Sequence, residues 1–463
     1  MPNEFQSGDQ STSTRWNQTP FDPVDAKSAL AQLPQLPAVF ALYGADAHAE
    51  PYIGRTPNLR SRLERLLQPS AKHPRRLHLA GLVRRIEWQL TGSEFESLLA
   101  QFSLLEEIFG SRALERMHMR HPAFVRFLGS NPYPRVTVTH RPSLREADWA
   151  YGPFPSRAAA ERFSEEMLKL FLLRRCTFEL APDPSYPGCV YSEMKMCLAP
   201  CFKGCTDDRY AEESAAVERF LATRGESRLI TLRAERDKAS ADLAFESAAS
   251  LHAQVQHVES VRALAAELVR PLSQLRALIV QASADLDEVA VFLFDNGRLR
   301  GPAVFSTLGM RIQNEQSGST SLFAQPLAIE AIPEATEKLR IEKQGAREQG
   351  SEEAEKLGEG RSDGSAADPQ AAMQAPGSPK LARGVLESRL EDVLGELSAS
   401  AGPPSSATRQ GHLALLKRWY FRPEAKRAGE IFFPDAENHW PTKSILRGIG
   451  RVAAKAIAPL PKA

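Results

Sequence analysis

The chain has 463 residues, of which 42% are hydrophobic and 25% are charged, and its net charge at pH 7 is +1. This composition is ordinary for a soluble protein with a hydrophobic core, and the length allows two to four domains. The near-zero net charge excludes a global electrostatic argument for nucleic-acid binding. The amino terminus is polar and lacks the apolar run of a signal peptide, and no stretch reads as a membrane span, so we expect a cytoplasmic location.

Hydrophobic periodicity predicts an α/β (α+β) multidomain protein. Short apolar runs alternate with helical stretches over residues 36–110, which predicts a small sheet packed by helices. A strongly helical stretch follows at 226–267, and strands joined by a tight turn at Asn296-Gly297 are expected within a small β unit at 272–330. The remaining boundaries are a disordered tail at 1–35, a linker at 111–170, a cysteine-rich region at 171–222, a disordered linker at 336–384 and a basic carboxy-terminal segment at 386–463.

Positive charge is concentrated locally. From Arg55 to Arg85 the chain carries nine lysines and arginines against one acid, Glu64. Such a patch can replace the counterions condensed on a phosphate backbone, so it is a candidate DNA-binding surface. A solvated basic face without a partner is the alternative. The residues expected to contact DNA are Arg55, Asn58, Arg60, Arg65, Arg75 and Arg76.

Four of the five cysteines, Cys176, Cys189, Cys197 and Cys201, are spaced C-x12-C-x7-C-x3-C. Thiolates are soft, charged ligands, and four of them complete one iron–sulfur cluster or one tetrahedral zinc site. Zinc sites tend to use two short cysteine pairs, whereas this spacing contains one, which favours a cluster. If residues 197–205 are helical, Cys205 shares a face with Cys197 and Cys201, where it substitutes for a ligand or simply packs. Unpaired buried thiols are the alternative reading, and the odd count and lack of a secretion signal disfavour disulfides.

The segment that holds these cysteines, RRCTFELAPDPSYPGCVYSEMKMCLAPCFKGC, resembles the cysteine-rich region of the UvrC family, the nuclease subunit of the bacterial excinuclease that removes damaged DNA. The resemblance continues through WAYGPFPSRAAAERFSEEMLKLFLLRRC upstream and TDDRYAEESAAVERFLAT downstream, and it extends in order over roughly residues 36–310. It implies a 4Fe-4S cluster on the four spaced cysteines, with zinc as the alternative, and a role in nucleotide excision repair.

The amino-terminal unit resembles a GIY-YIG nuclease domain. Ala38-Val39-Phe40 stands at the first signature and Tyr52-Ile53-Gly54 at the second, while Asn58, Leu59 and Arg62 keep the N-L-x-x-R spacing. Such a nuclease needs an oxygen base near the attacking water, a cation that stabilises the pentacovalent phosphate and a carboxylate that holds Mg²⁺. The resemblance assigns the first role to Tyr52 and the second to Arg62.

Two positions of this site depart from the family pattern. Gln101, in TGSEFESLLAQ, replaces the metal-binding glutamate, and Phe40 replaces the first signature tyrosine. Glutamine keeps a carbonyl oxygen but lacks the negative charge that a divalent cation prefers, and phenylalanine has no hydroxyl group. Each lost catalytic group typically costs about 10²–10⁴ in rate, so little Mg²⁺-dependent cleavage is expected. The alternatives are a degenerate domain that still binds DNA and a purely structural one.

The segment SADLAFESAASLHAQVQHVES resembles the UVR motif, a short antiparallel helix pair by which UvrC proteins grip a matching pair on the helicase subunit UvrB. The alternative is an intramolecular hairpin packed on its own domain, since apolar stripes on helices are more often core than interface. The residues expected to contact the partner are Leu243, Phe245, Glu246, Ala249 and Leu251.

The sequence contains no D-x-S-H segment, which opens the second, RNase-H-type nuclease domain of the family. Together these features predict a UvrC-like repair protein that binds damaged DNA with UvrB and contributes at most one Mg²⁺-dependent incision. The alternative is a non-catalytic adaptor that occupies UvrB or DNA without cutting. A redox-sensing iron–sulfur protein is a third reading.

Overall fold

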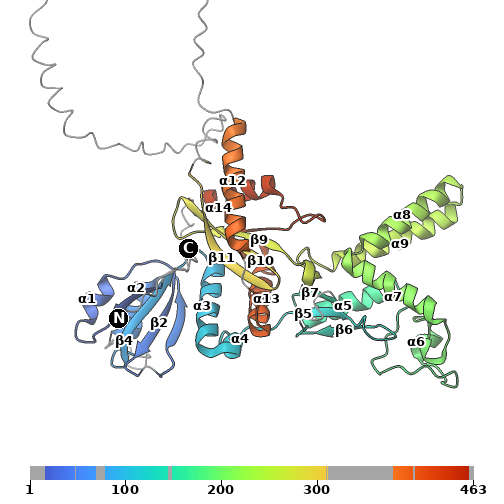
Figure 1. Cartoon of the computed structure of the whole chain (residues 1–463), viewed down its shortest axis with the longest axis horizontal. Coiled ribbons are helices and arrows are strands. Elements are labelled where there is room, and N and C mark those ends of the chain that lie inside the picture. Colours follow the sequence, from blue (N-terminus) through green and yellow to red (C-terminus); the bar gives the residue numbers. More distant parts are fainter. Residues whose placement is uncertain are drawn as a thin grey trace, which may run out of the picture. The chain divides into compact units, whose positions relative to one another are not determined.

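The computed structural model describes residues 16–46, 48–68, 79–143, 149–308, 310, 379–399 and 402–457. The described residues form helices and three sheets of four strands each (Figure 1), which confirms the mixed α/β class. The disordered linker expected at 336–384 lies outside the described residues except at its end, where α12 begins at Pro379. None of the described helices has the length and apolar character needed to cross a membrane.

The first sheet has the strand order β1-β4-β2-β3, and its neighbouring strands are antiparallel. Its strands are β1 (Asn17–Pro20), β2 (Ala38–Gly44), β3 (Tyr52–Thr56) and β4 (Val83–Leu90). Buried leucines of α1 (Ala26–Ala31) and α2 (Leu59–Leu67) pack into the core of this sheet.

The disordered tail expected at 1–35 is corrected from Asn17 onward. Strand β1 pairs with β4, and Phe21 and Leu30 are buried behind it. The strand sequence NQTP is short and polar, so its composition carries no strand signal, and pairing with the edge of β4 determines its conformation.

The second sheet, ordered β6-β5-β7-β8, occupies much of the stretch where a linker at 111–170 was expected. Its aromatic residues, including Phe127, Tyr151 and Phe154, share a hydrophobic core with the helices that follow. Within the expected linker, the segment PRVTVT reads as strand-like, whereas the Gly-Pro pair in YGPFPS reads as a turn and conceals a second strand. The elements are β5 (Ala123–Phe127), β6 (Val136–Thr139), β7 (Ala150–Phe154), β8 (Arg270–Pro271), α5 (Arg157–Leu168), α6 (Val190–Glu193) and α7 (Asp207–Ala222).

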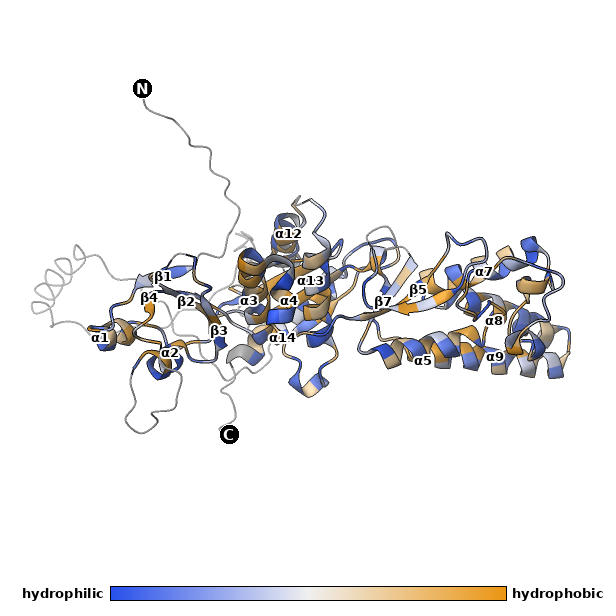
Figure 2. Ribbon diagram, turned by 90° about the horizontal axis from the view of Figure 1, so that it is seen from below, coloured by the Kyte–Doolittle hydropathy of each residue, from blue (hydrophilic) through white to orange (hydrophobic). Residues whose placement is uncertain are grey.

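Helices α8 (Glu226–Ala241) and α9 (Phe245–Ala263) run side by side as a hairpin (Figure 1). Hydrophobic and hydrophilic residues alternate along α9 (Figure 2). Leu229 and Leu232 on α8 and Val258 on α9 are buried in the core of the second sheet, so the hairpin is anchored at its base.

The third sheet has the order β11-β10-β9-β12. Asn296 and Gly297, with φ of 49° and 77°, connect β10 to β11, which confirms the predicted tight turn. Strand β12 comes from the carboxy-terminal segment and pairs with β9. The elements are β9 (Ala277–Ala282), β10 (Glu288–Asp295), β11 (Arg298–Ser306), α12 (Pro379–Ser398), α13 (Ser406–Tyr420), β12 (Glu430–Phe432) and α14 (Thr442–Ile457).

Helix α3 (Glu94–Phe109), followed by the short α4 (Ala113–Arg116), shares one hydrophobic core with the third sheet and α13. The Phe95 ring lies 5.2 Å from that of Phe292 and 5.4 Å from that of Trp419, measured between ring centroids. The carboxy-terminal segment is therefore packed on the helix that carries Gln101.

Gly411 on α13 allows this close approach. A Cβ atom at position 411 would lie 1.9 Å from the Phe102 ring, so Gly411→Ala pushes α13 away from α3 and is expected to destabilise the fold by about 1–3 kcal/mol. Gly395→Ala on α12 is the matched control, because an added Cβ there meets nothing within 4 Å, and it should be neutral or slightly stabilising. Thermal melting distinguishes the two variants, and equal melting temperatures would contradict the α3–α13 contact.

Candidate nucleic-acid site and cysteine centre

Tyr52 and Arg62, the two catalytic candidates that keep the family identity, lie together. The Asn58 side chain caps α2 by accepting a hydrogen bond from the Ser61 N–H at 3.0 Å, which fixes where the helix begins. Arg62 follows one turn later, and its Nη2 donates to the Tyr52 hydroxyl oxygen at 3.3 Å. A guanidinium group beside a phenol oxygen can hold a phosphate oxygen close to that phenol.

Phe40 occupies the position of the missing signature tyrosine. It pairs with Gly54 across the sheet, is fully buried, and its ring centroid lies 6.2 Å from that of Tyr52. A Cβ atom on Gly54 would lie 2.8 Å from the end of the Phe40 ring, so the glycine of the second signature makes room for this ring. The position keeps its aromatic packing but supplies no oxygen.

The position expected to hold a metal carries an amide that is already hydrogen-bonded. Arg55 on β3 donates from Nε to Gln101 Oε1 at 2.7 Å, and both side chains are half-buried. The carbonyl oxygen that could approach a cation therefore accepts from a cationic side chain instead. A divalent cation at this point would also be repelled by the Arg55 guanidinium.

The two carboxyl groups in the first turn of α3 do not replace the missing one. Arg422, which follows α13, binds Glu94 through two hydrogen bonds of 2.6 and 2.7 Å. Glu96 is buried and accepts a hydrogen bond from the Gly92 N–H at 2.8 Å. Burial raises the pKa of Glu96 to about 7, so this carboxyl group is only partly ionised at neutral pH.

The arginines of the predicted basic patch that lie on α2 do not share one face of the helix. Arg60 donates from Nε to a backbone carbonyl just after α1 at 2.7 Å. Because successive residues of a helix are rotated by about 100°, Arg60 and Arg62 point in nearly opposite directions, whereas Arg62 and Arg65 share a face of α2. Arg75 and Arg76 lie outside the described residues.

The four spaced cysteines converge. Burial raises the pKa of the Cys197 thiol, and repulsion from Cys189, Cys201 and Cys176 raises it further. Burial raises the pKa of the Cys205 thiol, and Cys201 is the one cysteine that adds to this effect.

Backbone strain marks the same loop. Lys195, Ala199 and Lys203 adopt left-handed conformations, with φ of 54°, 54° and 57°. Such values are uncommon for residues other than glycine and persist where the surrounding structure requires them. They allow the chain to turn repeatedly around Cys197 and Cys201.

A buried arginine lies beside the cysteines. Arg174 is 1% exposed; its Nη1 donates to the Phe178 carbonyl at 2.9 Å and lies 3.5 Å from Cys176 Sγ, while Nη2 has no partner among the described residues. No carboxylate in the described part of the chain pairs with this guanidinium, and a buried cation needs a compensating negative charge. Four thiolates around a metal centre would supply that charge, so the donor set fits an anionic cluster.

The tip of the α8–α9 hairpin exposes the residues predicted to bind a partner. Leu243 and Phe245 are 71% and 67% exposed, Glu246 and Ala249 are exposed, and Leu251 is half-buried. This end of the hairpin is therefore exposed, and it is not packed into the core of its own domain as the alternative would require.

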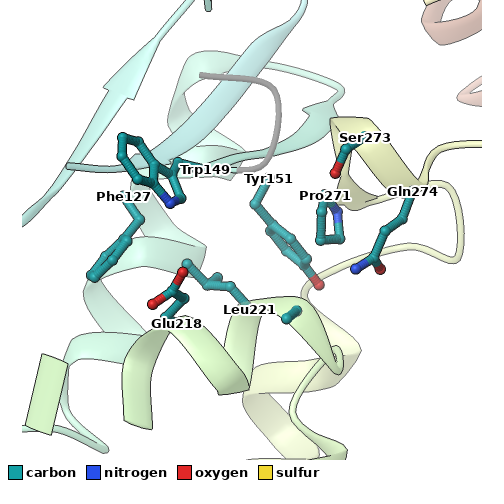
Figure 3. Close-up of a pocket in the computed structure, with 9 residues that line it drawn as sticks. Phe127, Trp149, Tyr151, Glu218, Leu221, Pro271, Ser273 and Gln274 are labelled. Carbon is teal, nitrogen blue, oxygen red and sulfur yellow. The ribbon is translucent and has the colours of Figure 1, made fainter. Parts of the chain in front are cut away.

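A pocket of about 160 Å³ lies in the second sheet, beside α7 and the segment that follows β8. Figure 3 shows the rings of Phe127, Trp149 and Tyr151 around it, with the Glu218 carboxylate at its side. Burial raises the pKa of Tyr151 to about 12, so its hydroxyl group stays protonated at neutral pH. None of the residues predicted from the sequence lines this pocket.

Three arginines beside these sites were not among the residues predicted from the sequence: Arg174, Arg418, which lowers the pKa of Arg55 by its charge after the larger effect of burial, and Arg422. The last two lie in the run KRWYFRPEAKR, where basic residues are interleaved with aromatic ones. That interleaving is the signal that could have identified them, because it is typical of surfaces that contact nucleic acid.

Residues 124–220 match the family model described as the middle domain of the UvrC/Cho excinucleases. The chain is related to the UvrC proteins. It is similar to UvrABC system protein C of Alcanivorax borkumensis (27% identity over 61% of this chain and 46% of the relative), of Pseudomonas entomophila (28% over 59% and 43%) and of Dechloromonas aromatica (30% over 51% and 39%). This chain spans less than half the length of these UvrC relatives. No solved structure matched it.

These matches confirm the UvrC resemblance. The matched UvrC middle domain contains β5 to β7, α5, the cysteine loop and most of α7.

Proposed function

We propose that this chain is a DNA-binding protein of UvrC-type nucleotide excision repair whose amino-terminal domain cuts DNA slowly or not at all. The relation to UvrC proteins supports the repair class. The Tyr52–Arg62 pair supports contact with a phosphate group. The main observation behind the proposal is the hydrogen bond from Arg55 to Gln101, because Gln101 occupies the position at which the resemblance expects a metal-binding glutamate.

The residues present do not fit a bound Mg²⁺. Gln101 supplies a neutral oxygen that is already engaged, Glu94 is ion-paired with Arg422, and Glu96 is buried. Mg²⁺ dehydrates reluctantly and is held in proteins by carboxylates. Arg62 and Tyr52 can orient a phosphodiester, but no carboxylate among these residues is left to hold the metal.

The test is cleavage of damaged duplex DNA with Mg²⁺, in the presence of a UvrB-type helicase. The natural chain should bind the duplex but nick it slowly or not at all. Gln101→Glu combined with Phe40→Tyr should raise Mg²⁺-dependent nicking at least tenfold, because each restored catalytic group is typically worth about 10²–10⁴ in rate.

Arg62→Ala in that double variant should abolish the gain. Gln18→Glu is the control, since it adds the same charge at an exposed position on β1 of the same sheet, at the edge opposite β3 and outside the proposed site. Rapid cleavage by the natural chain that survives Arg62→Ala would disprove the assignment of this site.

We further propose that the tip of the α8–α9 hairpin docks on the UvrB-type helicase subunit. Leu243 and Phe245 form an exposed apolar end on a hairpin whose base is already buried. Large exposed apolar side chains gathered at one end of an element are typical of a binding surface.

Phe245→Ala should weaken binding to the helicase about tenfold or more, because burying a phenylalanine at an interface is worth roughly 1.5–3 kcal/mol. Leu82→Ala is the matched control, since Leu82 is 69% exposed against 67% for Phe245 but lies in the amino-terminal domain. Calorimetric titration of both variants measures the difference. Equal affinities, or unfolding of the Phe245 variant, would contradict docking through this tip.

We also propose that Cys176, Cys189, Cys197 and Cys201 hold an iron–sulfur cluster. The supporting observations are the convergence of the four cysteines and the uncompensated charge of Arg174 beside them. A cluster of this kind would stabilise the loop that its ligands span.

Changing any one of these four cysteines to serine should remove most of the iron bound by the anaerobically prepared protein. The Cys205→Ser variant should keep its iron. Iron and sulfide analysis, with the visible absorption of the cluster, measures this. A stoichiometric zinc content without iron would exclude the cluster.

A further inference from the structure

Three arginines from separate parts of the chain gather at the start of α3. Arg55 comes from β3, Arg418 from the last turn of α13, and Arg422 from the residues after it. Arg422 binds Glu94 through two hydrogen bonds, and Arg55 binds Gln101. Arg418 and Arg422 both lower the pKa of Arg55, whose largest shift comes from burial, so the three guanidinium groups lie within electrostatic range of one another.

Two of these arginines keep hydrogen-bonding capacity. Within the described part of the chain, Gln101 is the one hydrogen-bond partner of the Arg55 side chain, and it occupies Nε alone. Arg418 is exposed, and its side chain makes no hydrogen bond to any described residue. Guanidinium groups present their remaining N–H donors in a planar fork that matches the oxygens of a phosphate.

The charge balance of this group favours an anion. Three guanidinium charges face one carboxylate, Glu94, because Gln101 is neutral and brings no second negative charge. A divalent cation placed here meets a net positive field, whereas a phosphodiester meets attraction and free donors.

We propose that Arg55 and Arg418 bind backbone phosphates of DNA without a metal ion, while Arg422, held by Glu94, adds positive charge beside them. These three residues are defined here as the arginine cluster. The inference rests on the proposed function, since it requires that the chain bind DNA. The carboxy-terminal helix α13 then contributes directly to the DNA surface of the amino-terminal domain. The shared chemistry is a phosphate oxyanion, and DNA and free inorganic phosphate are its two candidate sources.

The experiment measures binding of the full chain to a fluorescent duplex in EDTA over a range of salt concentrations. Arg418→Gln should lower the affinity about 3–10-fold at low salt and reduce the slope of log K against log salt by about 0.9, the value for one lost phosphate contact. The double variant Arg55→Gln with Arg418→Gln should reduce the slope by about twice that amount. Millimolar inorganic phosphate should compete weakly with DNA, because it offers one phosphate group in place of a chain.

Arg219→Gln is the matched control, because Arg219 is an exposed arginine on α7 outside the cluster. It should behave like the natural chain, and melting temperatures should show that all variants are folded. Arg418→Lys keeps the charge but loses the fork, so it should give an intermediate affinity.

Three results would overturn the inference. The first is DNA binding that Arg55→Gln with Arg418→Gln leaves unchanged, which rejects the arginine cluster but not the proposed function. The second is binding that disappears in EDTA and returns with Mg²⁺, which shows a metal site instead. The third is a natural chain that binds no DNA at all, which rejects the proposed function as well.

Discussion

The packing of α3 against α13 is the constraint on which the candidate site depends. Phe95 and Phe102 of α3 contact Trp419 and His412 of α13, and the missing side chain of Gly411 lets the two helices approach. The other side of α3 faces β3, where Gln101 meets Arg55. One helix thus connects two parts of the protein that are more than 300 residues apart in sequence, as the Glu94–Arg422 pair illustrates. Any movement of α13 would displace Arg418 and Arg422, and with them the ion pair at Glu94.

Two buried basic side chains, His412 and Arg174, differ in whether they carry a charge in the protein interior. His412 is buried, and burial lowers its pKa to about 3, so it is neutral and its Nδ1 accepts the Leu299 N–H at 3.0 Å. Arginine has no such option, because it stays protonated in proteins. Arg174 must therefore keep its charge beside Cys176, and the protein supplies carbonyl oxygens for only part of its donors. Because Arg174, unlike His412, cannot lose its charge, we expect a compensating negative charge at the cysteines beside it.

The sequence predicted what depends on local chemistry. The Asn296-Gly297 turn needs only the left-handed preference of its two residues, and the mixed α/β class follows from periodicity. The resemblance to GIY-YIG nucleases implied roles at one site for Tyr52 and Arg62, and the structure places them in hydrogen-bond contact. What depends on distant partners could not be predicted: β1 is specified by its pairing with β4, and Arg422 by the packing of α13 on α3. Of the second sheet, the sequence indicated only the strand in PRVTVT, because the other strands are short and irregular, although they contain fully buried residues such as Ala123 and Phe154.

The pairing of β12 with β9 has a consequence for how the protein is made. Val280 pairs with Glu430, about 150 residues later in the chain, while the other neighbours in this sheet follow one another directly. At about 5–20 residues per second, a ribosome leaves the apolar edge of β9 without its partner for roughly 10 s or more. Open strand edges of this kind are templates for pairing with other chains. During this interval the nascent protein exposes an unpaired strand edge and needs protection from aggregation. Fragments that end before α13 lack β12 and would expose this edge permanently.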